Sequence, residues 1–191
     1  FIIYLPRLER KMSTKITILG CGSSGGVPRV GFGWGECNPR NEKNRRTRCS
    51  LLVEKKVGSE KISVLIDTGP DIRQQMLSAD VQNLDAILYT HAHADHANGI
   101  DDLRQFLWTK KENLPVYGSK STINSLKKRF DYIFDQKNSY FQPPLDVNII
   151  KNGPVNILNN TVYAFKQNHG KETTLGYRFD NFVYSTDVKS F

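Results

Sequence analysis

Short runs of β-branched and other apolar residues, separated by Gly, Pro, Asn and Asp, form the main hydrophobic pattern from residue 15 onward. Such runs predict β-strands, and the residues between them predict turns. The segments 50–54 and 62–67 are expected to pair as a hairpin through 57–60. The strands expected along the chain are 15–19, 50–54, 62–67, 85–89, 116–117, 147–150, 155–158, 162–167, 175–179 and 182–184.

Three other segments show helical spacing of their apolar residues. Residues 71–78 are predicted to form a short helix capped by Asp71, and residues 100–107 and 122–134 are predicted to form two more. Strands come first, helices alternate with strands in the middle, and strands return at the end. This order predicts an α+β fold with sheets covered by helices, rather than an all-helical or doubly wound fold.

The composition is that of a folded domain, since 38% of the 191 residues are hydrophobic and 24% are charged. No apolar run approaches the roughly 18 residues that span a bilayer, which argues against a membrane protein. Three scattered cysteines are too few for a disulfide framework, so a reduced, cytoplasmic setting is expected. In residues 1–11 an apolar stretch precedes the charges, the reverse of a signal peptide. We expect these residues to be an upstream extension of one domain that covers 12–191.

The chain is basic, with 27 Lys and Arg against 19 Asp and Glu and a net charge of +8. This excess favours a polyanionic partner such as a nucleic acid, a nucleotide or a phosphoester, although it also serves simple solubility. Much of it lies in one segment, 40–48. A solvated loop is one interpretation of this segment, and a loop that contacts substrate phosphate through Arg45, Arg46 and Arg48 is the other.

The segment 20–25 matches the G-x-G-x-x-G pattern after a predicted strand. In a dinucleotide site this pattern must open a helix, whose N-terminus holds the pyrophosphate. Residues 26–35 contain four glycines and a proline, which excludes a helix there. We therefore predict a tight glycine-rich turn that lets the backbone approach another segment closely.

The strongest chemical signal is an H-x-H-x-D-H motif, formed by His91, His93, Asp95 and His96 after the strand 85–89. Three of the four histidines of the chain fall in it, so chance explains it poorly. Residues two apart at a strand end point the same way, so His91 and His93 can bind one ion. The other two residues can reach a second ion. Imidazole and carboxylate suit zinc, and also iron or manganese. The competing interpretation is a solvated polar loop.

His169 and Asp187 each follow a predicted strand. Each taken alone is typical of a surface loop, but together with the motif both become candidate ligands, because metal sites are commonly assembled at strand ends. Cys37 and Cys49 have no C-x-x-C partner, so a structural zinc on the cysteines is not predicted.

These motifs together resemble the metallo-β-lactamase-fold hydrolases. The H-x-H-x-D-H motif is preceded by Asp67-Thr68-Gly69 and followed by His169 and Asp187, in the order of that family. The opening Leu19-Gly20-Cys21-Gly22, with Gly25-Gly26-Val27-Pro28, is similar to the phosphodiesterase branch, which includes tRNase Z and the phosphoribosyl 1,2-cyclic phosphate phosphodiesterase. The resemblance implies an αβ/βα sandwich of two mixed β-sheets with outer helices.

The resemblance also implies a dinuclear site with two zinc ions, or with manganese or iron in their place. Asp67 would be a buried acid that orients the ligand loop. Asp95 and His96 are the residues expected to be catalytic as well as ligating. The implied ligands are His91, His93 and His169 for the first ion, Asp95 and His96 for the second, and Asp187 between the two.

The implied reaction is attack of a metal-bound hydroxide on a small, cyclic or nucleotide-like phosphodiester. Processing of RNA ends, as by tRNase Z, is an alternative, and so is hydrolysis of a thioester or lactam by the same fold. A non-catalytic nucleic-acid-binding module is the remaining class and rests on the net charge alone.

Two features depart from the family. Only Cys37 stands near the cysteine cluster that holds an extra zinc in the phosphonate enzyme, so that site is not carried over. The family also has a further histidine ligand and a final α/β unit downstream of Asp187, whereas this sequence ends at Phe191. From the resemblance we expect a domain truncated at its C-terminus, which holds the second ion weakly and is poorly active.

Overall fold

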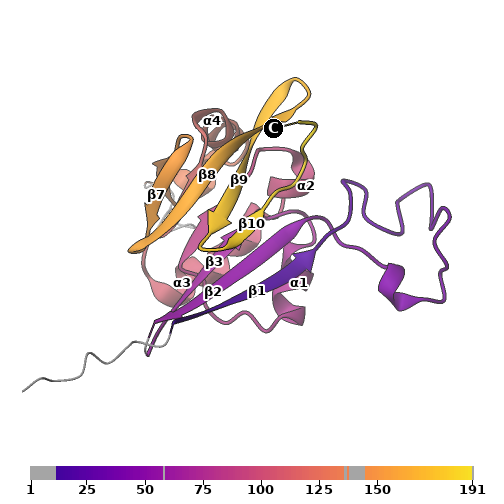
Figure 1. The fold of residues 1–191 in the computed structure, drawn as a ribbon, viewed down its shortest axis with the longest axis horizontal. Helices are drawn as coiled ribbons and strands as arrows, with labels where there is room; N and C mark the ends of the chain where they lie inside the picture. Colours follow the sequence, from indigo (N-terminus) through magenta and orange to yellow (C-terminus); the bar gives the residue numbers. More distant parts are fainter. Residues whose placement is uncertain (1–11, 58, 136, 138–144, 191) are drawn as a thin grey trace, which may run out of the picture.

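The computed structural model describes residues 12–57, 59–135, 137 and 145–190, which form two β-sheets and several short helices (Figure 1). The expected extension over residues 1–11 lies outside the described residues. Within them, no helix is long and apolar enough to cross a membrane.

The larger sheet has six strands in chain order. Its first three strands pair antiparallel, and the third to the sixth pair parallel, so the sheet is mixed. The predicted hairpin between the second and third strands is confirmed. The strands are β1 (Met12–Gly20), β2 (Ser50–Val57), β3 (Glu60–Ile66), β4 (Ala86–Leu88), β5 (Leu114–Gly118) and β6 (Leu145–Ile149).

The smaller sheet has four strands in the order β10-β9-β8-β7, all antiparallel to their neighbours. Asn159 and Asp180, at the two predicted turns, have positive φ angles of 64° and 48°, which these residue types tolerate. The strands are β7 (Gly153–Ile157), β8 (Asn160–His169), β9 (Glu172–Phe179) and β10 (Phe182–Tyr184).

Helices follow strands β3, β4 and β5 of the larger sheet. The α-helices are α1 (Ile72–Ser78), α2 (Ala94–Ala97), α3 (Arg104–Lys110), α4 (Lys120–Arg129) and α5 (Asp131–Phe134), and the 3₁₀ helices are η1 (Glu42–Asn44) and η2 (Ile100–Leu103).

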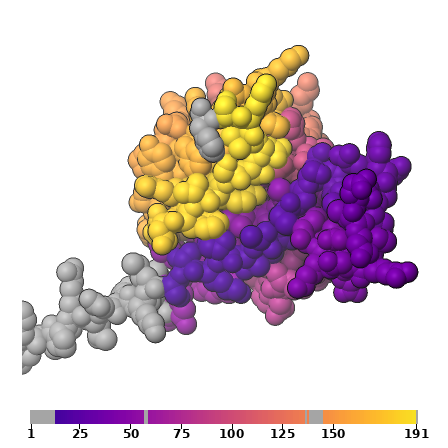
Figure 2. Space-filling view, turned by 45° about the vertical axis from the view of Figure 1, so that its right-hand side comes forward, coloured from indigo at the N-terminus to yellow at the C-terminus, as the bar shows by residue number. Residues whose placement is uncertain are grey.

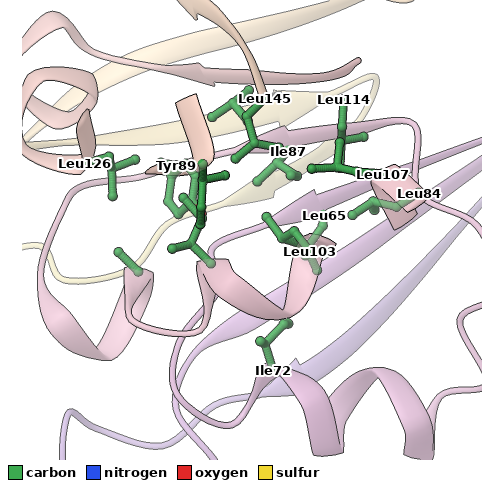
Figure 3. Close-up of a cluster of buried hydrophobic side chains, with 14 of the residues drawn as sticks. Leu65, Ile72, Leu84, Ile87, Tyr89, Leu103, Leu107, Leu114, Leu126 and Leu145 are labelled. Carbon is green, nitrogen blue, oxygen red and sulfur yellow. The ribbon is translucent and has the colours of Figure 1, made fainter. Parts of the chain in front are cut away.

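The core lies on both faces of the larger sheet, because successive side chains of a strand point to opposite faces. Leu65 of β3 packs on the helix side with Ile87 and Leu107 (Figure 3). Its neighbours Val64 and Ile66 pack on the other side, against the smaller sheet. Strands buried on both faces need continuous apolar runs, which is the pattern that the sequence shows in 64–66 and 86–89.

Residues 21–49 form an arm that projects from the ends of β1 and β2 (Figure 1) and makes the indigo lobe of the space-filling view (Figure 2). The arm closes on itself at its base, where Gly22 N donates to Thr47 O at 2.7 Å. A Cβ atom on Gly20 would overlap the carbonyl oxygen of Arg48. The predicted close approach of the glycine-rich turn is therefore confirmed, and no helix follows it between residues 20 and 35.

The structure corrects four details. The second sheet is antiparallel in its described part, and not mixed as expected. The predicted helix 122–134 is two helices, because Phe130 leaves the helical conformation at φ −133° and ψ 42°. The predicted helix 100–107 begins as a 3₁₀ turn. Asp71 stands at the start of α1 without capping it, because its carboxylate accepts hydrogen bonds from Arg48 instead.

Candidate metal centre

The H-x-H-x-D-H motif occupies a loop and a short helix directly after β4, where the parallel strands of the larger sheet end. The backbone of Asp67-Thr68-Gly69, directly after β3, holds it in place: Thr68 N donates to His96 O at 2.7 Å, and Gly99 N donates to Thr68 O at 2.8 Å. A Cβ atom on Gly69 would overlap the carbonyl oxygen of Asp95. Glycine at this position therefore allows the two segments to touch.

Asp67 is fully buried beneath the motif. Its carboxylate accepts hydrogen bonds from Thr90 N at 2.8 Å, from Thr90 Oγ1 at 2.7 Å and from His96 Nδ1 at 2.7 Å. A buried carboxylate is costly unless it is paired in this way. The structure thus brings Asp67 to the place expected for an acid that orients the ligand loop.

These contacts fix which ring nitrogens face the centre. Because the Thr90 hydroxyl donates to Asp67, it must accept the proton of His91 Nδ1, which lies 3.0 Å away. His96 likewise directs Nδ1 at Asp67. Both histidines therefore turn Nε2 inward. Such fixing of the tautomer by the outer nitrogen is the usual arrangement of metal-binding histidines.

His93 shows the opposite orientation. Its Nδ1 lies 3.0 Å from His91 Nε2, and its Nε2 lies 3.1 Å from Glu172 Oε2. Two nitrogens bound to one zinc ion at about 2.0–2.1 Å are separated by about 3 Å. The His91 and His93 nitrogens are thus spaced as two ligands of one ion, and Glu172 holds the outer nitrogen of His93.

His169, at the end of β8, and Asp187, after β10, bring the smaller sheet into the site. Asp187 Oδ2 lies 3.6 Å from His91 Nε2, 3.5 Å from His96 Nε2 and 3.6 Å from His169 Nε2. Asp187 therefore belongs to two groups of converging ligand atoms, each within 4.8 Å. The groups are His91, His93, His169 and Asp187, and Asp95, His96 and Asp187.

The donor set fits divalent metals. Nitrogen from imidazole and oxygen from carboxylate are the ligands that zinc takes in catalytic sites, and they also suit iron and manganese. The shared Asp187 places the two groups side by side, as a dinuclear site requires. The three cysteines are absent from both groups. Cys49 donates its thiol to Gly22 O at 3.3 Å.

In the metal-free site the neighbouring groups shift one another's pKa values. Burial opposes the charged form of His96, but the carboxylates of Asp67 and Asp187 outweigh it and raise the pKa of His96 to about 11. Burial, together with the charge on His96, lowers the pKa of His91 to about 4. The hydrogen bond from His96 lowers the pKa of Asp187 to about 2. At neutral pH the metal-free site therefore holds a proton on His96, in the place where a second ion would sit.

The model of the family described as "Beta-lactamase superfamily domain" matches residues 63–191, more than half of the chain. This range contains Asp67 and every candidate ligand described above. The chain belongs to the beta-lactamase superfamily.

Several solved structures and curated proteins are similar to this chain. A solved "New Diphosphatase from the PhnP Family" is 32% identical with a TM-score of 0.81, over 94% of this chain and 67% of that one. An octanoyltransferase of Porphyromonas gingivalis is 37% identical over 90% of this chain and 34% of its own length. A ribonuclease Z of Thermococcus kodakarensis is 32% identical over 61% of this chain and 37% of its own. This chain thus spans about a third of the length of these two curated relatives.

The three arginines predicted to contact substrate phosphate lie in the arm or at its end, outside both groups of candidate metal ligands. Arg48 is half-buried, and its Nη1 pairs with Asp71 Oδ1 at 2.8 Å. Arg45 lies over the ring of Trp34, 5.3 Å from its centroid. Arg46 is exposed, and its Nη1 lies 3.4 Å from Arg45 O. Their contact with substrate stays a prediction.

Three residues that support the candidate metal centre were not predicted from the sequence. Thr90 and Glu172 hold the outer nitrogens of two histidines, and Arg129 of α4 donates to Ala92 O within the motif and to Asn98 Oδ1 just after it. Of the three, only Thr90 could have been noticed in the sequence, because it is a polar residue between an apolar strand and a histidine. The other two reach the site from distant segments.

Proposed function

We propose that this chain is the metal-binding domain of a dinuclear zinc phosphodiesterase that acts on a small, cyclic or nucleotide-like phosphodiester. The observation that carries the proposal is the convergence of His91, His93, His169 and Asp187 with the neighbouring Asp95 and His96. The name of the solved relative, a diphosphatase, supports phosphoryl chemistry.

The roles of the residues follow from their positions. His91, His93 and His169 would hold the first ion, Asp95 and His96 the second, and Asp187 both. Bound divalent ions would neutralise charge on the phosphoryl oxygens and make water acidic enough to be a nucleophile at neutral pH. Manganese or iron would fit the same ligands.

Asp67 keeps the proton of His96 on Nδ1, because it accepts that hydrogen bond in a fully buried position. Thr90 does the same for His91. Glu172 would keep the proton of His93 on the other ring nitrogen, Nε2, from a more exposed position. These residues would therefore aim three inner nitrogens at the ions, which favours tight binding, and His96 would give up its second proton as the ion binds.

Processing of RNA ends is the second candidate, and a specific observation favours it. The arm 21–49 is basic and exposes aromatic and apolar residues, with Arg29 over the ring of Phe32, which is 77% exposed. Cations next to exposed rings suit single-stranded nucleic acid. Several curated relatives are named ribonuclease Z. The octanoyltransferase name is not carried over.

Two assays test the proposal and separate the candidates. Protein loaded with zinc and freed of excess metal should hydrolyse bis(p-nitrophenyl) phosphate, and His91→Ala should abolish the activity. A small-diester enzyme should prefer such compounds to an RNA with an extended 3′ end, and an RNA-processing enzyme should show the reverse. Bound metal without hydrolysis of either substrate would refute the catalytic proposal for this chain.

A further inference from the structure

A cavity of about 390 Å³ opens beside the histidine cluster. Its walls come from three places: residues 91–93 of the ligand loop, the first two turns of α4, and the turn between β8 and β9 with the start of β9. Small-ligand sites span roughly 300–1,000 Å³, so this cavity has room for more than a single phosphate group.

The walls away from the histidines are polar. Ser121 and Ser125 lie one turn apart on the same face of α4, and Lys171 and Thr173 face them from the β8–β9 side. Within the described part of the chain, no side-chain hydrogen bond or ion pair occupies Ser125, Lys171 or Thr173. The Ser121 hydroxyl lies 3.0 Å from that of Ser119 and keeps further hydrogen-bonding capacity.

One acidic residue, Glu172, also lines the cavity. Its carboxylate lies 3.1 Å from His93 Nε2, so it faces the ligand loop. Among the described residues, no acidic group forms an ion pair with Lys171, which is the lysine that lines the cavity. No aromatic side chain other than the histidines lines the walls, which disfavours a stacked nucleobase. An ammonium group with several hydroxyl donors is suited to phosphoryl oxygens.

We propose that this cavity binds a second phosphoryl group of the substrate, with Lys171 as its counter-ion and Ser121 and Ser125 as hydrogen-bond donors. The proposal rests on the proposed function only for its first part, that the reacting phosphodiester sits at the histidine cluster. The cavity would then select substrates that carry an additional phosphate over simple diesters.

The test uses metal-stripped protein, so that it does not depend on metal binding or hydrolysis. Glycerol 3-phosphate is titrated into the isotope-labelled chain, and glycerol serves as the uncharged control. Amide shifts should appear in 121–125 and 171–173 with glycerol 3-phosphate alone. Lys171→Met should weaken this binding at least tenfold. Lys166→Met, an exposed lysine of the same strand pair outside the cavity, should leave it unchanged.

Three results would overturn the proposal. They are an unchanged affinity in Lys171→Met, shifts confined to 91–96, and no saturable shifts at all. Thermal melts of both variants show whether each is folded, and Ser125→Ala, which removes a partly exposed hydroxyl, provides a second variant with an expected smaller loss. Because zinc is absent throughout, failure of the metal or diester assays would leave this result intact, and the reverse also holds.

Discussion

Asp67 Oδ2 lies 2.7 Å from His96 Nδ1, and both side chains are buried almost completely from solvent. The two residues come from different strand ends, after β3 and after β4. Their parallel pairing puts a carboxylate directly under an imidazole. The same carboxylate reaches His91 through the Thr90 hydroxyl. One buried acid therefore orients two of the candidate ligands.

Replacing Asp67 with Asn should weaken both the fold and the metal site. The amide cannot accept all three hydrogen bonds, and leaving a buried donor unpaired costs about 1–3 kcal/mol. Loss of such a partner typically lowers metal affinity about 10–100-fold. Chemical denaturation of the metal-free protein measures the first effect, and competition with a chelating dye measures the second. Asp180→Asn is the control, because Asp180 is 55% exposed and forms a surface ion pair with Lys55. Equal effects in both variants would contradict the role of Asp67.

Metal binding at the second group should release a proton. In the metal-free protein the raised pKa of His96, about 11, keeps this residue protonated at neutral pH, and metal must displace the proton. Affinity should therefore rise with pH between 6 and 8, by up to about tenfold per unit. Isothermal titration calorimetry in two buffers of different ionisation enthalpy counts the protons released. A heat that is independent of the buffer, with an affinity that is flat in pH, would exclude a protonated His96.

Glu172 should act on metal affinity through His93 alone. Glu172→Gln keeps an oxygen that can accept from Nε2 and should cost little, whereas Glu172→Ala should weaken binding by up to about tenfold. The unfolding midpoint of the metal-free protein should stay close to that of the parent, because Glu172 is more than half exposed. Identical metal affinities for the Ala variant and the parent would show that the contact has no such role.

The arginines of the arm should differ in what they do. If Arg46 contacts substrate phosphate, Arg46→Met should raise KM for a phosphodiester by an amount equal to about 1.5–3 kcal/mol, with little change in stability. Arg48→Met should instead destabilise the protein, because it leaves the carboxylate of Asp71 without its cationic partner.

Asp71→Asn separates the two readings of Arg48. It breaks the same ion pair and keeps the arginine charge. If it reproduces the whole effect of Arg48→Met, then Arg48 acts through structure. An unchanged KM in both Arg46→Met and Arg45→Met would support the other interpretation, in which the basic segment is a solvated loop.

The sequence located the strands and brought the candidate ligands together for a shared reason. The end of β3 and the whole of β4 are buried on both faces and are continuous apolar runs, and the polar loops that follow them contain Asp67 and His91. The order of strands and loops along the chain therefore predicted that the candidate ligands lie together at one edge of the sheet.

Other features depend on contacts that no local pattern records. Glu172 reaches His93 only because the smaller sheet packs over the larger one, and Arg129 reaches Ala92 only because α4 lies across the loop. Phe130 breaks its helix while it and Ile133 pack against the helix-side core, although the apolar spacing predicts one continuous helix. Tertiary packing decided these three positions.

The central claim is that His91, His93 and His169 hold one metal ion. Anomalous diffraction at the zinc edge, from crystals of protein loaded with zinc, tests it most directly. The account predicts a peak at about 2.0–2.1 Å from His91 Nε2, His93 Nδ1 and His169 Nε2. Loss of this peak in His91→Ala, with the fold intact, would support the assignment. A map of the zinc-loaded parent without a peak there, or with its zinc only at the cysteines, would contradict it.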